Sequence, residues 1–142
     1  MFCHFIPYKT YGPGENSKGA YSSIFHKFIN DLKANKAPVI YGNGKQKREF
    51  IYIEDNARAS VLAMEKGKAG EAYNIDTGIS TDFNSIFKII KEEMHSYIEA
   101  KYVKNPFTIY HMFTMSNIEK ARKELQFDPE YDIRGCIKRM LQ

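Results

Sequence analysis

Apolar positions along this chain follow two different spacings, which alternate from one end to the other. Short runs rich in aromatic and β-branched residues predict strands over residues 2–8, 39–41, 48–53, 72–75 and 100–103. Apolar residues at helical spacing predict helices that hold residues 24–32, 57–64, 83–97, 118–125 and 133–140, the third being the longest. This alternation of strands and helices indicates an α/β fold.

Polar residues and glycines mark the boundaries of these elements. Tyr11-Gly-Pro-Gly-Glu15 and Gly42-Asn-Gly44 are turn sequences, because Gly and Pro favour backbone angles that strands and helices do not use. The predicted helix starts carry residues that commonly cap helices: Ser22 or Ser23, Thr81 or Asp82, the capping-box pair Ser116 and Glu119, and Asp132.

Composition narrows the class of protein. The 142 residues suit one domain, and 43% hydrophobic and 27% charged residues are ordinary for a globular chain. Cys3 and Cys136 form no CxxC motif, so we expect two reduced thiols in a cytoplasmic protein with no membrane segment. The four histidines show no metal-ligand spacing, and the net charge of +4 is too small to indicate nucleic-acid binding alone.

The first candidate site is the loop Tyr11-Gly-Pro-Gly-Glu-Asn-Ser-Lys-Gly19. Its glycines expose backbone N–H groups, and Lys18 adds a cation that could hold a phosphate or transfer a proton. The alternative is an ordinary surface loop with a solvated lysine.

The second candidate is Tyr41-Gly-Asn-Gly-Lys-Gln-Lys-Arg48, a turn followed by three cations and a strand. The planar guanidinium of Arg48 could bind a diphosphate with two parallel hydrogen bonds. Two alternatives remain, a solvated hairpin tip and a nucleic-acid surface in which Tyr41, Phe50 and Tyr52 stack on bases.

Four segments in this order resemble the C-terminal half of the extended short-chain dehydrogenase/reductases, the NAD-dependent epimerase/dehydratase family. They are Tyr11-Gly-Pro-Gly-Glu15, Tyr41-Gly-Asn-Gly44, Arg48-Glu-Phe-Ile-Tyr-Ile-Glu-Asp55 and Tyr73-Asn-Ile-Asp-Thr-Gly78. Within the family, Lys18-Gly19 and Lys104-Asn-Pro-Phe107 are similar to segments of the ADP-glycero-manno-heptose 6-epimerases. The resemblance implies an isomerase of carbohydrate metabolism that acts in lipopolysaccharide biosynthesis.

The resemblance also implies roles for single residues. Lys18 matches a lysine thought to take part in proton transfer, and Thr10 a position near the nicotinamide of the cofactor. Arg48 matches the arginine that binds the nucleotide diphosphate. The remaining substrate-binding positions are Ala20, Lys27, Tyr41, Gly42, Asn43, Gly44 and Tyr110.

Several residues depart from the family pattern. Lys9 stands where the family has Asn, Glu49 where it has Asp, and Asp76 where it has Gly. The chain contains no G-x-G-x-x-G loop, and the Tyr-x-x-x-Lys spacing from Tyr97 to Lys101 lies outside the family context. We therefore expect one partial domain, with residues 1–20 ending a Rossmann-like core and residues 21–142 forming the substrate-binding region.

These observations predict the substrate-binding half of a nucleotide-sugar epimerase, inactive alone because the NAD- or NADP-binding half is absent. The expected partners are a nucleotide-diphosphate sugar and either the missing half or a second copy, since an uncovered parallel strand edge favours association. The alternatives are a standalone module that binds diphosphate sugars and a basic protein that binds nucleic acid or another protein.

Overall fold

The computed structural model describes residues 3–7 and 9–142. Met1 lies outside the described residues, as do Phe2 and Tyr8 of the first predicted strand. Three pairs of strands are parallel: β1 (His4–Pro7) with β6 (Ala72–Ile75), β2 (Thr10–Tyr11) with β5 (Ile51–Tyr52), and β3 (Val39–Tyr41) with β8 (Lys101–Val103). One pair, β4 (Lys47–Glu49) with β7 (Ser80–Asp82), is antiparallel. Strands β1 and β2 thus pair with strands that come much later in the sequence.

The helices are α1 (Ile24–Lys33), α2 (Ile53–Lys66), α3 (Phe83–Glu93) and α4 (Ile133–Leu141), together with the short 3₁₀ segment η1 (Glu15–Tyr21) and π-helical segment η2 (Ala121–Leu125). Ser23, Asp82 and Asp132 each cap a helix as predicted, by accepting a hydrogen bond from a backbone N–H of the first turn. None of the helices formed by the described residues is long and apolar enough to cross a membrane.

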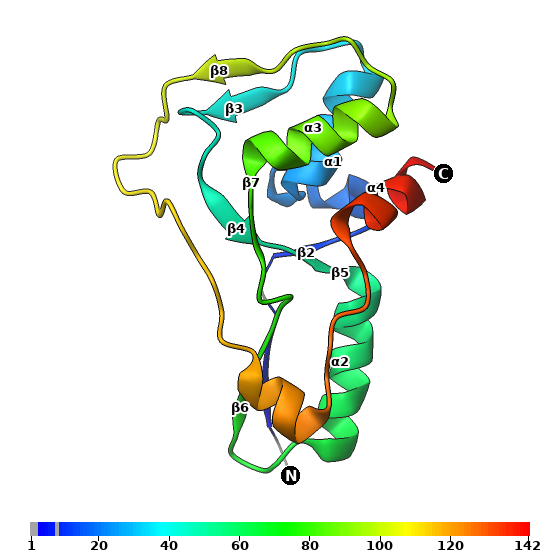
Figure 1. The fold of residues 1–142 in the computed structure, drawn as a ribbon, viewed down its shortest axis with the longest axis vertical. Coiled ribbons are helices and arrows are strands. Elements are labelled where there is room, and N and C mark those ends of the chain that lie inside the picture. Colours follow the sequence, from blue (N-terminus) through cyan, green and yellow to red (C-terminus); the bar gives the residue numbers. More distant parts are fainter. Residues whose placement is uncertain (1–2, 8) are drawn as a thin grey trace.

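Two groups of elements lie along the longest axis of the molecule (Figure 1). Helices α1, α3 and α4 form one group, with a core that includes Phe25, Phe28, Ile86, Ile90 and Ile137. The other group places α2 and η2 against the β1–β6 pair. Its core consists of Ile51, Ala59, Ala63, Tyr73, Ile75, Ala121, Leu125 and Phe127.

Strand β5 serves both cores. Ile51 belongs to the core beneath α2, whereas Phe50 and Tyr52 on either side of it belong to the core of α1, α3 and α4. Successive residues of an extended chain point in opposite directions, which explains this division.

The structure corrects several element boundaries. The predicted strand 48–53 divides at Phe50 into β4 and β5, and Ile53 already begins α2. Helix α3 ends at Glu93 because His95 adopts a left-handed backbone angle (φ 49°), so Tyr97 lies outside the helix and α2 is longer than α3. Strand β7 was not predicted.

The predicted capping box is also wrong. Ser116 caps no helix; its hydroxyl instead donates a hydrogen bond of 2.8 Å to Glu49 Oε2. Asn117 Oδ1 accepts the hydrogen bond from Glu119 N, at 2.9 Å, that a helix-capping side chain would accept.

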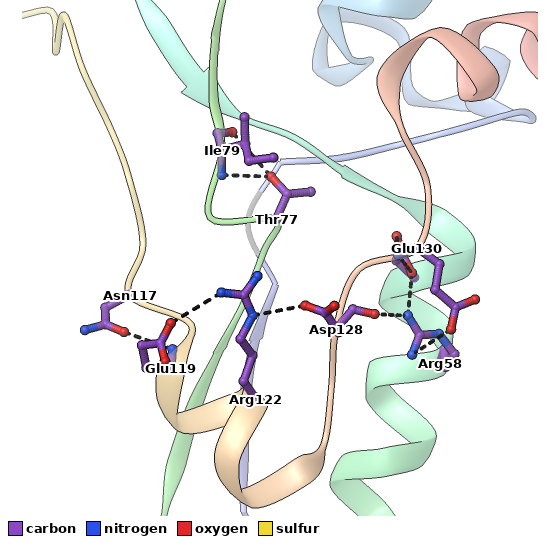
Figure 2. A network of polar contacts seen from close by, with 9 residues as sticks. Arg58, Thr77, Ile79, Asn117, Glu119, Arg122, Asp128 and Glu130 are labelled. Carbon is purple, nitrogen blue, oxygen red and sulfur yellow. Dashed lines mark hydrogen bonds and ion pairs between the residues drawn. The ribbon is translucent and has the colours of Figure 1, made fainter.

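Polar contacts fix the connection between η2 and α4 (Figure 2). Arg122 donates to Asp128 Oδ1 at 3.0 Å, and Arg58 on α2 contacts the Asp128 carbonyl and Glu130. The buried Asp55 carboxylate accepts hydrogen bonds from Glu130 N and Tyr131 N, at 3.0–3.2 Å. These contacts direct the chain from one core to the other.

Candidate functional site

A cavity of about 1050 Å³ opens beside α1. Seven parts of the described chain contribute to its lining: the start of β2, the end of η1, helix α1, strand β3, Phe50 between β4 and β5, the start of α3 and the segment after β8. The residues that the later argument uses are Lys9, Thr10, Ala20, Lys27, Asp31, Tyr41, Phe107 and Tyr110. Helix α1 and strand β3 lie in the upper part of the molecule in Figure 1.

A buried carboxylate holds the glycine-rich loop against the start of α1. Glu15 is 2% exposed and accepts hydrogen bonds from Ser23 N (2.7 Å), Ser23 Oγ (2.6 Å) and Gly12 N (3.3 Å). Burial raises the pKa of Glu15, but these hydrogen bonds and the charge of Lys18 outweigh it and lower the pKa overall. The loop therefore has a fixed geometry next to the cavity.

Lys18 is the charge partner of Glu15. Its Nζ lies 3.4 Å from Glu15 Oε2, and its side chain is 45% exposed. Among the described residues, Gly19 and Ala20 line the cavity but Lys18 does not. The proton-transfer role stays a prediction, and the structure supplies a structural role for the same amine.

Arg48 organises the segment that follows β8. Its guanidinium donates to the carbonyls of Lys47 (2.8 Å) and His111, and its Cζ lies 5.0 Å from the ring centroid of Tyr110. The Lys47 backbone also bonds to Met112 O (2.9 Å) and Thr114 N (3.3 Å). Strand β4 thereby places the Tyr110 ring at the cavity.

The turn Gly42-Asn-Gly44 packs against the start of α3. Asn84 N donates to Gly44 O (3.2 Å), and Asn84 Nδ2 donates to Asn43 O (3.0 Å). Both glycines have positive φ, 67° and 71°, which other residues adopt only with strain. Of the Tyr41–Gly44 segment, Tyr41 alone is among the lining residues, and its ring makes an edge contact with Phe107 at 6.1 Å.

The other predicted site residues fall at the cavity. Lys27 Nζ donates to Ala20 O at 2.8 Å, which joins α1 to the end of η1. Thr10, at the start of β2, also lines the cavity, and its Oγ1 accepts a hydrogen bond of 2.8 Å from Asn56. The structure therefore gathers Thr10, Ala20, Lys27, Tyr41 and Tyr110 around one space.

Most of the lining residues carry no role that the sequence predicts, among them Lys9, Asp31 and Phe107. Lys9 departs from the family pattern, and Phe107 belongs to a segment similar to the family. Their contribution depends on the pairing of β2 with β5 and on the packing of the segment after β8, which local patterns do not reveal.

Two of the three aromatic residues of the nucleic-acid alternative are buried. Phe50 is 4% exposed and Tyr52 is 2% exposed, and both belong to the hydrophobic core, whereas Tyr41 is 40% exposed. Bases cannot stack on rings that other side chains already cover.

Two buried carboxylates lie between the two cores. Glu49 Oε2 binds Ser116 and Asp76 Oδ1 accepts from Thr77 N (2.8 Å), whereas Glu49 Oε1 and Asp76 Oδ2 have no partner among the described residues. Burial, together with the negative charge of Glu49, raises the pKa of Asp76 to about 7. Neither residue lines the cavity.

The described residues include no group of three or more His, Cys, Asp or Glu side chains that could hold a metal ion. For a dinucleotide cofactor, the residues of this chain do not fit by themselves. They supply Thr10, but the sequence contains no G-x-G-x-x-G loop to bind the pyrophosphate. We therefore derive no chemical step through such a cofactor.

Comparison with known proteins assigns this chain to one protein family. The model of the NAD dependent epimerase/dehydratase family matches residues 1–76, more than half of the chain. The "Putative UDP-glucose 4-epimerase" of Methanocaldococcus jannaschii is 35% identical over 133 residues, which are 93% of this chain and 42% of that protein. The chain belongs to the NAD-dependent epimerase/dehydratase family, as the sequence motifs predicted.

Solved structures show the same fold. UDP-glucose 4-epimerase of Thermotoga maritima, in a complex with UDP-glucose, superposes with a TM-score of 0.88 at 27% identity and covers 96% of this chain. ADP-L-glycero-D-manno-heptose-6-epimerase of Helicobacter pylori superposes with a TM-score of 0.83 at 30% identity, also over 96% of the chain. This chain spans 43% and 42% of those two proteins, respectively, so it corresponds to less than half of such an enzyme.

Proposed function

We propose that this chain is the substrate-binding part of a nucleotide-sugar epimerase and that its cavity binds the nucleotide-diphosphate sugar. The observation that carries the proposal is the set of side chains at one cavity. Tyr110, whose ring contacts the Arg48 guanidinium, lines the same cavity as Lys9 and Lys27 and the aromatic residues Tyr41 and Phe107. Family membership supports the same conclusion, because similar epimerases act on or bind nucleotide sugars such as UDP-glucose.

In this proposal Arg48 binds the diphosphate. A guanidinium has five N–H donors, and the two carbonyls bound to Arg48 use two of them. The remaining donors keep the planar arrangement that suits phosphate oxygens. Tyr110, stacked on Arg48, contacts the substrate at the same place.

The rings of Tyr41 and Phe107 offer apolar surface for a planar base, since both are partly exposed at the cavity. The turn that follows Tyr41, which consists of Gly42, Asn43 and Gly44, is assigned to the rest of the nucleotide. Ala20 and Lys27, on η1 and α1, also line the cavity, and we assign them to the sugar and to the phosphate next to it. The volume of about 1050 Å³ is large enough for a ligand of this size.

Lys18 is proposed to take part in proton transfer, and Thr10 to lie near the nicotinamide of NAD or NADP. The similarity of Lys18-Gly19 and of the segment around Phe107 to the heptose 6-epimerases supports ADP-glycero-manno-heptose as the substrate. We further infer a cytoplasmic enzyme of lipopolysaccharide biosynthesis, of which residues 1–142 form one partial domain. Alone, the chain is expected to bind the substrate without epimerising it.

Isothermal titration calorimetry tests the binding. We expect the chain to bind UDP-glucose and ADP-glycero-manno-heptose, the second more tightly. Arg48→Lys keeps the charge but removes the planar fork, so affinity should fall about tenfold, in keeping with ~1–3 kcal/mol for a charge-assisted hydrogen bond.

Arg139→Lys is the matched control. Arg139 also stacks on a tyrosine, with its Cζ 4.8 Å from the Tyr131 ring, but neither residue lines the cavity. This variant should bind as the wild type does. Absence of binding at millimolar ligand would refute the proposed function, and interconversion of the heptose epimers by the chain with NADP would refute its expected inactivity.

A further inference from the structure

Lys9 occupies a defined place beside the proposed diphosphate site. Its carbonyl accepts a hydrogen bond of 3.2 Å from Ile51 N, which fixes it at the entrance of β2 next to β5. Lys9 lines the cavity, as does Phe50, which lies between β4 and β5. The position of this amine follows from strand pairing and not from a flexible loop.

The charges around Lys9 are predominantly positive. Burial lowers the pKa of the Lys9 amine, and the nearby charges of Arg48 and Lys27 lower it further. Among the described residues, none of these three cations has a carboxylate within salt-bridge distance. Lys27 and Arg48 donate to backbone carbonyls instead. In the free protein, the three cations therefore repel one another without a bound counter-charge.

The charge balance of the cavity indicates what would neutralise it. Among the described lining residues, Lys9 and Lys27 are the basic side chains and Asp31 is the carboxylate. Arg48 is buried and does not line the cavity, but its charge acts on Lys9, so the three cations outnumber the lining carboxylate by two. A diphosphate that links a nucleoside to a sugar carries two negative charges at neutral pH. Repulsion in the free site would thus become attraction in the complex.

We propose that Lys9 is a further binding residue for the diphosphate and forms one anion site with Arg48 and Lys27. This inference rests on the proposed function and deepens it. The ammonium of Lys9 acts as a compact point charge on a flexible stem, whereas Arg48 supplies the planar fork. A neutral side chain at position 9 would remove one of the three positive charges of this anion site.

The test measures binding of two probes, UDP-glucose and inorganic pyrophosphate, by calorimetry at low and high salt. Lys9→Gln should weaken both probes five- to twentyfold at low salt, and the difference from the wild type should shrink as salt screens the charge. Lys9→Arg should restore most of the affinity, which separates loss of charge from disturbed folding.

Lys123→Gln serves as the control, because Lys123 is an exposed lysine on η2 at the other end of the molecule (Figure 1). It should bind both probes as the wild type does. A second readout is proton exchange, measured in buffers of different ionisation enthalpy over a series of alkaline pH values. Because the pKa of Lys9 is lowered in the free protein and a bound anion favours the charged amine, the wild type should take up more protons on binding than Lys9→Gln.

The outcomes separate the two proposals. Unchanged affinity of Lys9→Gln for UDP-glucose overturns the role of Lys9 and leaves the proposed function intact. If the wild type binds pyrophosphate but not nucleotide sugars, and Lys9→Gln loses pyrophosphate, the anion site stands and the proposed function falls. If the wild type binds neither probe, both are refuted.

Discussion

Replacing Asp76 with Asn should stabilise the protein above neutral pH. Asp76 is fully buried, one of its oxygens has no partner among the described residues, and Glu49 places a second negative charge nearby. An amide of the same shape removes the charge and keeps an oxygen for the hydrogen bond from Thr77 N. The variant therefore removes a buried charge without opening a cavity.

The magnitude follows from the pKa of the folded state. The pKa of Asp76 rises from 3.8 to about 7, so between these pH values the folded chain holds a proton that the unfolded chain has lost. Stability is therefore greatest below pH 3.8 as far as this group is concerned, falls as pH rises, and levels off above about pH 7. At ~1.4 kcal/mol per pH unit, the loss amounts to about 4 kcal/mol.

Urea unfolding followed by circular dichroism at pH 5, 6, 7 and 8 measures this effect. The decline of the unfolding free energy between pH 5 and 7 should be present in the wild type and largely absent in Asp76→Asn. Asp82→Asn is the control: it changes a carboxylate at the cap of α3, and the decline should persist. The reasoning is refuted if Asp76→Asn keeps the wild-type slope or is less stable than the wild type at pH 8.

Two further predictions concern the frame of the cavity. Glu15→Gln should lower the unfolding free energy by about 1.5–3 kcal/mol at pH 7, because the buried carboxylate accepts several hydrogen bonds. Since the folded pKa of Glu15 is lowered, this stabilisation is present above pH 4.5 and is lost as pH falls, so urea melts of the two proteins should converge in acid; equal stability at pH 7 would contradict the prediction. Gly44→Ala and Gly42→Ala share a positive φ, which costs roughly 1–2 kcal/mol in either case. A Cβ at Gly44 would lie 1.9 Å from Asn84 Oδ1, whereas one at Gly42 would meet nothing within 4 Å, so Gly44→Ala should melt at a lower temperature; equal melting temperatures would exclude this clash as a cost.

The sequence predicted most of the elements because their signals are local. Ser23, Asp82 and Asp132 cap helices whose apolar faces recur at helical spacing, and both properties can be recognised within a few residues. The end of α3 could not be recognised in this way. The apolar pattern continues to Tyr97, but a left-handed residue at His95 turns the chain first, and Tyr97 is 95% exposed.

The candidate site depended on contacts between distant residues. The motifs identified Arg48 and Tyr110 separately, but their stacking arises from the way the segment after β8 lies along β4. Nothing local in the sequence shows that Lys18 pairs with the buried carboxylate of Glu15, which also accepts a hydrogen bond from the Ser23 hydroxyl. Likewise, Glu49 and Asp76 were recognised only as departures from the family pattern, because nothing local shows that they are close in space.

The connection pinned to Asp55 and Arg58 also bears on how the chain acquires its structure during synthesis. The core beneath α2 requires Ala121, Leu125 and Phe127, and the core around α1 requires Cys136 and Ile137. Neither core is thus complete before residues 121–137 have left the ribosome. Because the closing contacts join residues far apart in sequence, slow folding after these residues emerge is expected.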